Sequence, residues 1–594
     1  MCGIAGVLGH PDAAVLQRMN RLQQHRGPDE NDVWLDEDVG FAHARLSILD
    51  LQSSQQPMTG AEGSVVILNG EIYNHQVLRA NHAAYPFQTA GDTEAVLAAH
   101  HAARQARPRM TSNDHAAWLA TLDGMYAIAL WHPASRELIL ARDPMGIKPL
   151  SRTVVDNSLM FASEIKAFRA DERYVPELDD VAMAARLVWE YPLDGTTLLK
   201  GVHQVRPGTV ERWSLNSHDQ PVLLDVADIE RQVLAPANDW DPSANAADLL
   251  ESFVSGVQQR LMADVPVGIV LSGGLDSSLV AAVAHEAAQR AEQPVPECWT
   301  VAESEDNPDW KAAEVVASHH DLVHHQHLLE PAAFEKRLPK LAWHGEDADV
   351  TVMFFHPLFE HMANHVKVGL CGQGADELHA GYPRYGALDD HGRTLKQRMD
   401  ALPSHLNAAL LNGGLSPEQG WYKSKHDPQA ITNDLQTMLN FELEHGQLSN
   451  FQLRLVDRHS MAHSLEVRVP FLGSDHRAAS YGLPEEWKRG AGREEKAALR
   501  KAADLTQLPK EIVRRPKLPA GRATSPSMLE QFLSERRSQT EELLEHYTQW
   551  APALKGQEEL ALGLGLFESL HLREDGHRRT SHSIDNLIAE VISP

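Results

Sequence analysis

The chain has 594 residues, 43% of them hydrophobic, so it can bury more than one hydrophobic core and we expect two to four domains. Its 82 acidic and 54 basic side chains give a net charge of −28, which argues against a nucleic-acid-binding surface, because such a surface needs clustered lysine and arginine. No apolar run approaches the roughly 20 residues that span a bilayer, no secretory leader is recognisable and the three cysteines form no Cys-x-x-Cys pair, so we expect a cytoplasmic protein without membrane contact or disulfides.

Residues 1–213 are predicted to form the first domain, built mainly of short β-strands. The β-prone runs are residues 65–68, 126–131, 137–141 and 209–213. Turn signals such as Asp143-Pro144 and Pro207-Gly208 separate them. The pattern is typical of packed antiparallel sheets with a few helices.

Cys2 is a candidate catalytic nucleophile. The small residues that follow Met1 usually permit its removal, which would give Cys2 a thiol and a free α-amine on one residue. An α-amine with a pKa near ~7.7–8.0 is a suitable base for the thiol. The alternative is an incidental cysteine at a frayed chain end.

Three further clusters in this domain carry groups that suit an amino-acid ligand. Arg45 can bind an α-carboxylate through two parallel hydrogen bonds, and Glu71 and Asp92 can bind an α-ammonium group. The Asn69 amide and the Gly70 N–H can donate to a developing oxyanion. Singly, each has a simpler explanation, since Asn-Gly is common in turns and Asp92 could cap a helix.

Several motifs occur together in one order. They are Cys2-Gly3-Ile4 and residues 25–29, 45–48, 69–74 and 142–149. In these motifs the first domain resembles the glutaminase domain of class II glutamine amidotransferases. The resemblance implies an N-terminal-nucleophile αββα sandwich in which Cys2 attacks the side-chain amide of glutamine and releases ammonia. It also implies that glutamine is bound by Arg45, Asn69, Gly70, Glu71 and Asp92, with Asn69 and Gly70 also catalytic.

Residues 214–245 are predicted to link the first domain to a second one at 246–594. Ala235 to Asp239 and Asp241-Pro242-Ser243 have the composition of a linker. After it the apolar residues follow a helical period, from Leu249 to Leu261, and then strand, loop and helix alternate. Strands are expected at 265–271, 297–302 and 366–370, and helices at 278–290 and 309–318. This alternation indicates an α/β domain with a largely parallel sheet, followed by helices from about residue 400 and a polar helical tail at 525–594.

Two glycine-rich turns follow predicted strands of the second domain. In residues 272–278 the glycines and the start of the next helix suit a phosphate, and the turn lacks the Gly-Lys-Ser/Thr ending of a Walker loop. Residues 371–377 form a second such turn. Asp276 and Asp376 can share Mg²⁺ together with the phosphates. The alternative for Asp376 is a helix cap.

The second domain resembles the synthetase domain of asparagine synthetases in residues 272–278, 372–382, 457–472, 496–500 and 508–517. The resemblance implies an adenine-nucleotide α-hydrolase-like (PP-loop) fold with a helical C-terminal part and the homodimer common in the family. It places Glu346 next to an acyl-adenylate and Lys496 on the α-phosphate of ATP in the transition state. The implied ATP-binding residues are Leu271, Ser272, Gly273, Gly274, Asp276, Ser277, Ala302, Cys371 and Gly372.

Several positions depart from the commoner pattern of that family. Cys371 replaces a serine, Gln373 often a glutamate, and His379-Ala380 the pair Phe-Gly. Gly473 replaces an aspartate, and residues 518–520 replace a glutamine-glycine-aromatic run. These positions leave open which carboxylate accepts the nitrogen.

The 33 histidines are scattered, and His319-His320 with His324-His325 are the densest group among them. This segment has no acidic or cysteine partner at ligand spacing, so the sequence gives little support for a metal site there.

The leading hypothesis is a glutamine-dependent asparagine synthetase. Ammonia released at Cys2 attacks β-aspartyl-AMP formed from aspartate and ATP, and gives asparagine, glutamate, AMP and pyrophosphate. One alternative is an enzyme of the same design that amidates another carboxylate, in a peptide, a natural product or a cell-wall precursor. Ring closure, as in β-lactam-forming relatives, is disfavoured by Cys2. A regulator that binds glutamine or nucleotide without turnover is the remaining alternative.

Overall fold

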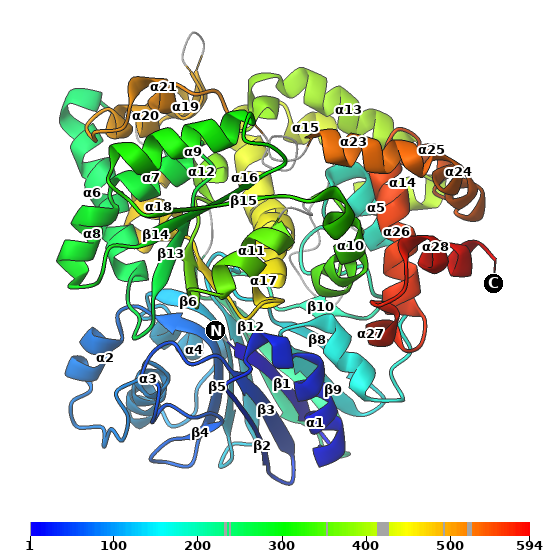
Figure 1. The fold of residues 1–594 in the computed structure, drawn as a ribbon. Helices are drawn as coiled ribbons and strands as arrows, with labels where there is room; N and C mark the ends of the chain where they lie inside the picture. Colours follow the sequence, from blue (N-terminus) through cyan, green and yellow to red (C-terminus); the bar gives the residue numbers. More distant parts are fainter. Residues whose placement is uncertain are drawn as a thin grey trace.

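The fold was analysed in a computed structural model, which describes residues 2–230, 235–236, 239–351, 355–412, 427–490, 494–518 and 526–593. Met1, part of the expected linker (residues 231–234 and 237–238) and residues 519–520 of the departing run lie outside these ranges. Figure 1 shows the first domain, blue to cyan, below the larger second domain, and the N-terminus near the boundary between them.

Two antiparallel six-stranded sheets form the first domain. The first has the order β10-β8-β9-β1-β3-β2 and the second β12-β11-β7-β6-β5-β4. The strands of the first sheet are β1 (Cys2–Leu8), β2 (Glu30–Leu35), β3 (Val39–Arg45), β8 (Ser151–Val155), β9 (Ser158–Ala162) and β10 (His203–Gln204). Those of the second are β4 (Met58–Thr59), β5 (Val65–Ile72), β6 (Gly124–His132), β7 (Glu137–Arg142), β11 (Thr209–Leu215) and β12 (Pro221–Asp228).

The two sheets pack face to face over an apolar core. Alternate residues of the strands, such as Ile4, Phe41, Ile67 and Trp131, are buried in it. Helix α1 (Ala13–Leu22) packs on the outer face of the first sheet, and α3 (Thr93–Ala106) and α4 (Ser112–Leu119) pack on the outer face of the second. The predicted αββα sandwich is therefore confirmed.

The segment expected to link the domains is partly a strand. Strand β12 pairs with β11 along its length and completes the edge of the second sheet. Its outward side chains Val222, Leu224 and Val226 are exposed, and Asp225 interrupts the run, so the segment did not resemble a buried strand. The next helix, α6 (Pro242–Arg260), begins before residue 246 because the Asp241 side chain caps it by accepting from the Ser243 N–H.

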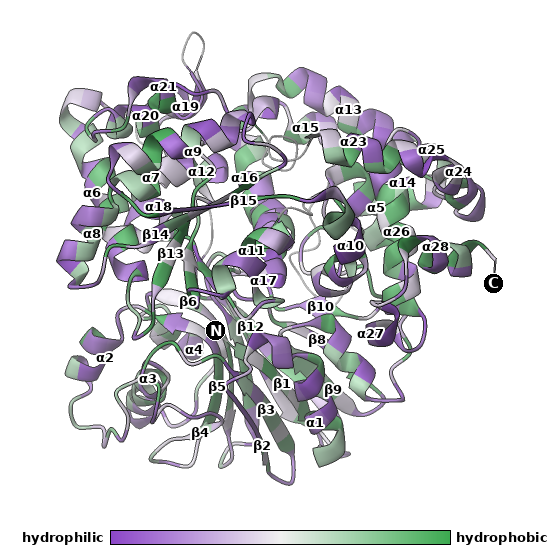
Figure 2. Cartoon of the chain, viewed as in Figure 1, coloured by the Kyte–Doolittle hydropathy of each residue, from purple (hydrophilic) through white to green (hydrophobic). Residues whose placement is uncertain are grey.

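A five-stranded parallel sheet is the centre of the second domain, with the order β15-β14-β13-β16-β17. The sequence predicted β13, β14 and β16 but neither of the edge strands β15 and β17. The strands are β13 (Val267–Val270), β14 (Glu297–Ala302), β15 (His324–Leu328), β16 (Val368–Leu370) and β17 (Glu466–Arg468). In Figure 2 the inner strands β13 and β14 are mainly green, whereas the edge strand β15 is purple.

Helices enclose this sheet and extend to the C-terminus (Figure 1). None of the described helices is both long and apolar enough to cross a membrane. The tail is helical, as expected, but it is not polar throughout, because residues 560–567 are apolar or glycine and are all buried. The helices used below are α7 (Leu275–Ala282), α9 (Pro308–His319), α10 (Pro331–Gly345), α11 (Phe355–Ala363), α12 (Ala375–His379), α17 (Leu453–Met461), α20 (Ala497–Ala503) and, in the tail, α26 (Glu558–Phe567).

Candidate active sites

Cys2 is buried at the start of β1, where it pairs with Arg45 of β3. Its N–H donates to Asn69 Oδ1 at 3.1 Å, and Arg26 Nε donates to its carbonyl at 3.1 Å. Burial raises the pKa of the Cys2 thiol above its ordinary value. A buried thiol of this kind needs a base close to it before it can act as a nucleophile.

The Asn69-Gly70 pair lies inside β5 and forms no turn. Gly70 has a φ of +148° and pairs with Tyr126 of β6. A Cβ atom at this position would lie 1.9 Å from the Met125 carbonyl oxygen, so only glycine allows the two strands this approach. The glycine keeps Asn69 beside Cys2.

The three charged side chains proposed for glutamine lie at the end of β3 (Arg45), on β5 (Glu71) and just before α3 (Asp92). Asp92 precedes α3, but its carboxylate makes no capping bond and accepts from the Ile72 N–H at 2.8 Å. Burial, together with Glu466 and Asp92, raises the pKa of Glu71 well above its ordinary value. Arg45 donates to Glu30 at 3.1 Å, so a bound carboxylate would replace Glu30 as its partner.

A groove between the domains opens next to Arg45. Its volume is ≈ 810 Å³, within the range of small-molecule sites. Arg45 donates to the carbonyl oxygens of Asp50 and Leu51, which lie in the wall of this groove. The other lining residues are Leu49, Gln52, Tyr73, His75, Gln76, Ala90, Gln258, Gln259, Met262, Ala263, Asp264, Ala291 and Gln293.

The two glycine-rich turns meet at the carboxyl ends of the neighbouring parallel strands β13 and β16. A Cβ at Gly372 would lie 2.9 Å from Ser277 N, and one at Gly273, whose φ is +70°, would lie 2.6 Å from Ala313 N. Both glycines are therefore required for the turns to pack this closely. Ligands of open α/β sheets bind at this edge.

Asp276 and Asp376 are brought together by one lysine. Lys496 Nζ lies 2.6 Å from Asp276 Oδ1 and 2.6 Å from Asp376 Oδ1. Lys517 Nζ lies 2.6 Å from Asp376 Oδ2. Burial raises the pKa of Asp376, but Lys496 and Lys517 outweigh it and lower the pKa to about 2. Asp376 therefore faces the lysines and does not act as a helix cap.

Lys517 was not among the predicted site residues, although it ends a matching motif. It is one of four cations that line a cavity of ≈ 60 Å³ over the first glycine turn, with Lys496, Arg500 and Arg515. Arg515 NH1 also donates to the Gly273 carbonyl at 3.0 Å. The cavity is smaller than a nucleotide site, so it suits the phosphate end of a nucleotide rather than the whole molecule.

The remaining residues proposed for ATP lie around the same sheet edge. Ser272 and Ser277 are in hydroxyl contact at 3.0 Å within the first turn. Leu271 follows β13 and Cys371 follows β16, and burial raises the pKa of the Cys371 thiol to about 11. Ala302 ends β14, the strand on the other side of β13.

Glu346 lies at the contact with the first domain, apart from the contacts around Lys496. Its carboxylate accepts from the N–H groups of Ile165 and Lys166 at 3.1 and 2.9 Å and contacts Arg458 NH2 at 2.9 Å. Burial raises the pKa of Glu346, but Arg458 and Lys166 outweigh it and lower the pKa. The tail supports the loop after Glu346, because a Cβ at Gly563 of α26 would lie 1.8 Å from the Ala348 carbonyl oxygen.

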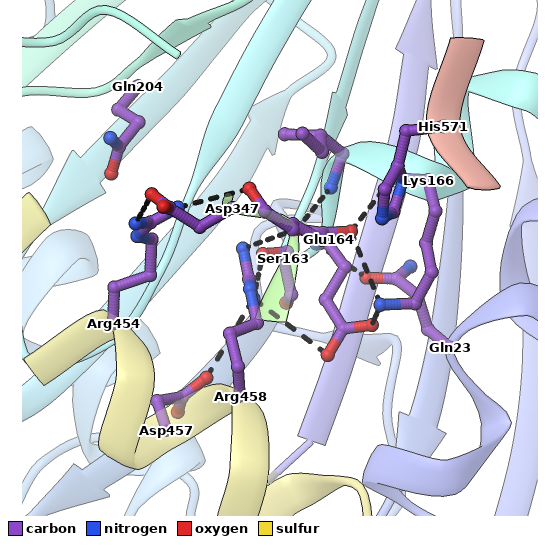
Figure 3. Close-up of polar contacts among 12 residues, drawn as sticks. Gln23, Ser163, Glu164, Lys166, Gln204, Asp347, Arg454, Asp457, Arg458 and His571 are labelled. Atoms are coloured by element: carbon purple, nitrogen blue, oxygen red, sulfur yellow. Dashed lines mark hydrogen bonds and ion pairs between the residues drawn. The ribbon is translucent and has the colours of Figure 1, made fainter. Parts of the chain in front are cut away.

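A buried network of charges joins the two domains next to Cys2 (Figure 3). Arg26 donates to Glu164 at 2.9 Å and to Asp457 of α17 at 2.8 Å. Arg458 donates to the Ser163 carbonyl at 2.8 Å, and Lys166 lies 2.5 Å from Glu164. The cations of this junction are Arg26, Lys166 and Arg458, and its carboxylates are Glu164, Glu346 and Asp457. Their formal charges cancel, as a buried set of ions requires.

We expect Glu164→Gln to destabilise the protein by about 3–5 kcal/mol, because it leaves buried cations without their carboxylate. The matched control is Glu177→Gln, which removes an exposed ion pair with Lys200 worth about 0–1 kcal/mol. Urea unfolding followed by fluorescence measures both. If the two variants lowered the urea midpoint equally, the buried junction would stabilise the protein no more than an exposed ion pair does.

The comparisons with known protein families give two separate matches, one in each half of the chain. Residues 1–221 match a glutamine amidotransferase domain family, and residues 248–552 match an asparagine synthase family. The first match ends within the sheet of the first domain, and the second begins in α6.

Three curated relatives cover most of the chain. Asparagine synthetase [glutamine-hydrolyzing] 1 of Bacillus subtilis (strain 168) is 30% identical over 575 residues, which cover 87% of this chain and 86% of that protein. Asparagine synthetase [glutamine-hydrolyzing] 3 of the same organism is 28% identical, over 92% of this chain and 91% of that protein. Asparagine synthetase [glutamine-hydrolyzing] 2 of Oryza sativa subsp. japonica is 29% identical, over 87% of this chain and 76% of that protein.

Proposed function

The chain belongs to the asparagine synthase family, and on this premise we propose that it is a glutamine-hydrolysing asparagine synthetase that uses ATP to amidate aspartate. The observation that carries the proposal is the presence of two unlike sites in one chain. One holds a buried thiol next to Asn69, and the other holds two aspartates and two lysines at the end of a parallel sheet.

In the first half-reaction the Cys2 thiol attacks the side-chain amide carbon of glutamine. With Met1 removed, the contact with Asn69 Oδ1 would hold the α-amine of Cys2 as a donor, so that its lone pair takes the thiol proton. The Asn69 Nδ2 and Gly70 N–H groups donate to the oxyanion. The intermediate loses ammonia, and water hydrolyses the resulting thioester to glutamate.

In the second half-reaction the β-carboxylate of aspartate attacks the α-phosphorus of ATP, and pyrophosphate leaves. Lys496 and Lys517 donate to the phosphate oxygens and offset the charge that develops on them. The carboxylates of Asp276 and Asp376 are the hard oxygen ligands that Mg²⁺ prefers, so they would hold this ion, which supplies further positive charge to the phosphates when bound. Ammonia then attacks the β-aspartyl carbonyl, and AMP leaves.

Ammonia must reach the adenylate without passing through solvent, where most of it would become ammonium. An apolar passage between the domains stays a prediction. The junction of Arg26, Glu164 and Arg458 next to Cys2 is charged, so such a passage would run beside this network and not through it.

Glu346 is proposed to take a proton from the attacking ammonia, and we expect Glu346→Gln to stop amide formation while Cys2-dependent glutaminase activity continues. The carboxylate now accepts from four donors, so a second role, holding the junction together, must be separated from the first. Amide product, glutamate release and the unfolding midpoint are measured on the same protein. If the variant lost both activities and its unfolding midpoint also fell, Glu346 would hold the junction together, and its proposed role as a base would be refuted.

A second candidate function is amidation of a different carboxylate. Gln373, in the second glycine turn, stands at a position where a glutamate is common in the family. Its side chain donates to Gln452 Oε1 at 3.1 Å. His379, two residues after Glu377, contacts His476 at 3.1 Å. These uncharged groups change the surroundings of the acceptor without touching the two lysines.

The test is an acceptor screen. The protein is incubated with ATP, Mg²⁺ and amide-labelled glutamine, and carboxylates are compared by AMP release, pyrophosphate release and the mass of the labelled product. Aspartate as the one good acceptor supports the asparagine synthetase. Turnover with another acid but none with aspartate supports the second candidate. If no acid gives pyrophosphate, both candidates are refuted.

A further inference from the structure

Four histidines from two elements meet on the surface of the second domain, away from both sites. His325 and His327 lie on β15, the edge strand that is purple in Figure 2, and His361 and His365 lie at the C-terminal end of α11 and just beyond it. Figure 1 shows α9 and α11 on opposite sides of this strand. The group therefore occupies the α11 side of the sheet.

The imidazole rings form a continuous chain of contacts. The His327 and His361 centroids are 5.1 Å apart, those of His361 and His365 5.9 Å, and those of His325 and His365 5.3 Å. Two imidazoles bound to one Zn²⁺ place their centroids roughly 5 Å apart, since each Zn–N bond is about 2.0–2.1 Å. Three neighbouring pairs have centroid separations near this value, but the ring nitrogens of the group do not all lie within 4.8 Å of one another, so the rings must turn before they can share an ion. Rotation of the partly exposed rings would turn their nitrogens towards it.

The sequence spacing explains why the four rings meet. Residues i and i+2 of a strand point to the same face, which aligns His325 with His327. His361 lies in the last turn of α11, and the turn that follows the helix, in which the His365 N–H donates to the Met362 carbonyl at 2.9 Å, keeps His365 next to it. The parallel sheet then sets the strand pair opposite the helix pair. Sequence reasoning missed the site because it compared His324 and His325 only with their neighbours along the chain.

One of the rings is already oriented as in a metal site. His325 Nε2 contacts Glu297 Oε2 at 2.6 Å, and the Trp299 ring stacks on the same imidazole at 4.5 Å. A carboxylate that accepts from one ring nitrogen fixes the tautomer and leaves the other nitrogen free to bind a metal. Here that free atom is Nδ1 of His325.

We propose that His325, His327, His361 and His365 bind one divalent transition-metal ion, with Zn²⁺ as the natural match for an all-imidazole donor set. Such donors suit zinc, copper and nickel and discriminate against Mg²⁺, which prefers oxygen. The ion would fasten the exposed edge strand to α11.

A second cluster, at the domain junction, is a poorer metal site. His25, Glu164 and His344 have ligand atoms within 4.8 Å of one another. However, Lys166 lies 2.5 Å and Arg26 2.9 Å from the Glu164 oxygens, and these cations would repel a divalent ion. The surface group has no such cation among the contacts described here.

The test is metal binding by the full-length protein after chelator treatment, without ATP or added Mg²⁺. Co²⁺ is titrated as a coloured probe of nitrogen ligation, and Zn²⁺ is titrated by calorimetry and by thermal unfolding. The variant is His361→Gln with His365→Gln, and the matched control is His319→Gln with His320→Gln, a neighbouring pair on and just after α9. Glu297→Gln keeps all four rings and removes only the orienting carboxylate.

We expect one ion for each chain, Co²⁺ absorption that Zn²⁺ abolishes, and a Zn²⁺-dependent rise in Tm. The His361/His365 variant should lose all three, while the His319/His320 control retains them. Glu297→Gln should bind about 10–100-fold more weakly. The proposal is overturned if the parent binds no ion, or if the control loses binding as fully as the variant. Catalytic activity is not a readout, so the result is independent of the proposed reaction.

Discussion

Cys2→Ala protein is expected to form no amide from glutamine and to form it from ammonium salts at the parental rate. The thiol is the one group proposed to make a covalent bond to glutamine, and loss of a catalytic nucleophile elsewhere lowers kcat by up to about 10⁶-fold. We therefore expect glutaminase activity to fall by at least about 10³-fold. Adenylation takes place at the other domain, around Lys496, where nothing has changed.

The measurement is labelled amide in the product, with glutamine or ammonium as the nitrogen source. Cys298→Ala is the matched control, because Cys298 is also a buried cysteine at a strand, on β14 of the second domain. It should keep both reactions. If Cys2→Ala used glutamine as well as the parent does, the proposed role of the thiol would be wrong, whichever acid is amidated.

The sequence predicted the elements whose hydrophobic pattern is local. β14 was predicted with its observed bounds, and the glycine turn after β13 was placed between strand and helix. Strand β17 was missed because two of its three residues, Glu466 and Arg468, are charged. They can be buried because they pair with each other at 2.6 Å and Arg468 also donates to the carbonyl oxygens of Arg260 and Met262, which no periodicity reveals.

Site residues were predictable where a single short motif contains both the functional side chain and the glycines around it. Asn69 and Asp276 are such cases, because the surrounding glycines mark close backbone approach. Lys517 was missed as a site residue, since its place beside Asp376 depends on how the chain folds back after α20. The contacts of Glu346 were equally invisible, because Lys166 belongs to the other domain and Arg458 lies far along the chain on α17.

Lys517→Met and Lys496→Met proteins are expected to release pyrophosphate about 10²–10³-fold more slowly than the parent, by analogy with the loss of one preorganised donor to a developing charge. In the structure two lysines neutralise two buried aspartates, 2.6 Å from their nearest carboxylate oxygens. When ATP binds, the same lysines can turn to the phosphates while a cation takes their place at the aspartates. Without one lysine the two aspartates keep one uncompensated negative charge close to the phosphates, which disfavours the nucleotide.

The decisive comparison separates this electrostatic role from a structural one. Glutaminase activity at Cys2 should persist in both variants, and the fall should be larger in kcat than the rise in KM for ATP, because the charge to be offset is greatest in the transition state. Lys501→Met, an exposed lysine of the same helix α20, is the control and should behave like the parent. If Lys517→Met retained parental pyrophosphate release, the lysine would serve only to neutralise Asp376, and Lys496 alone would have to stabilise the phosphates.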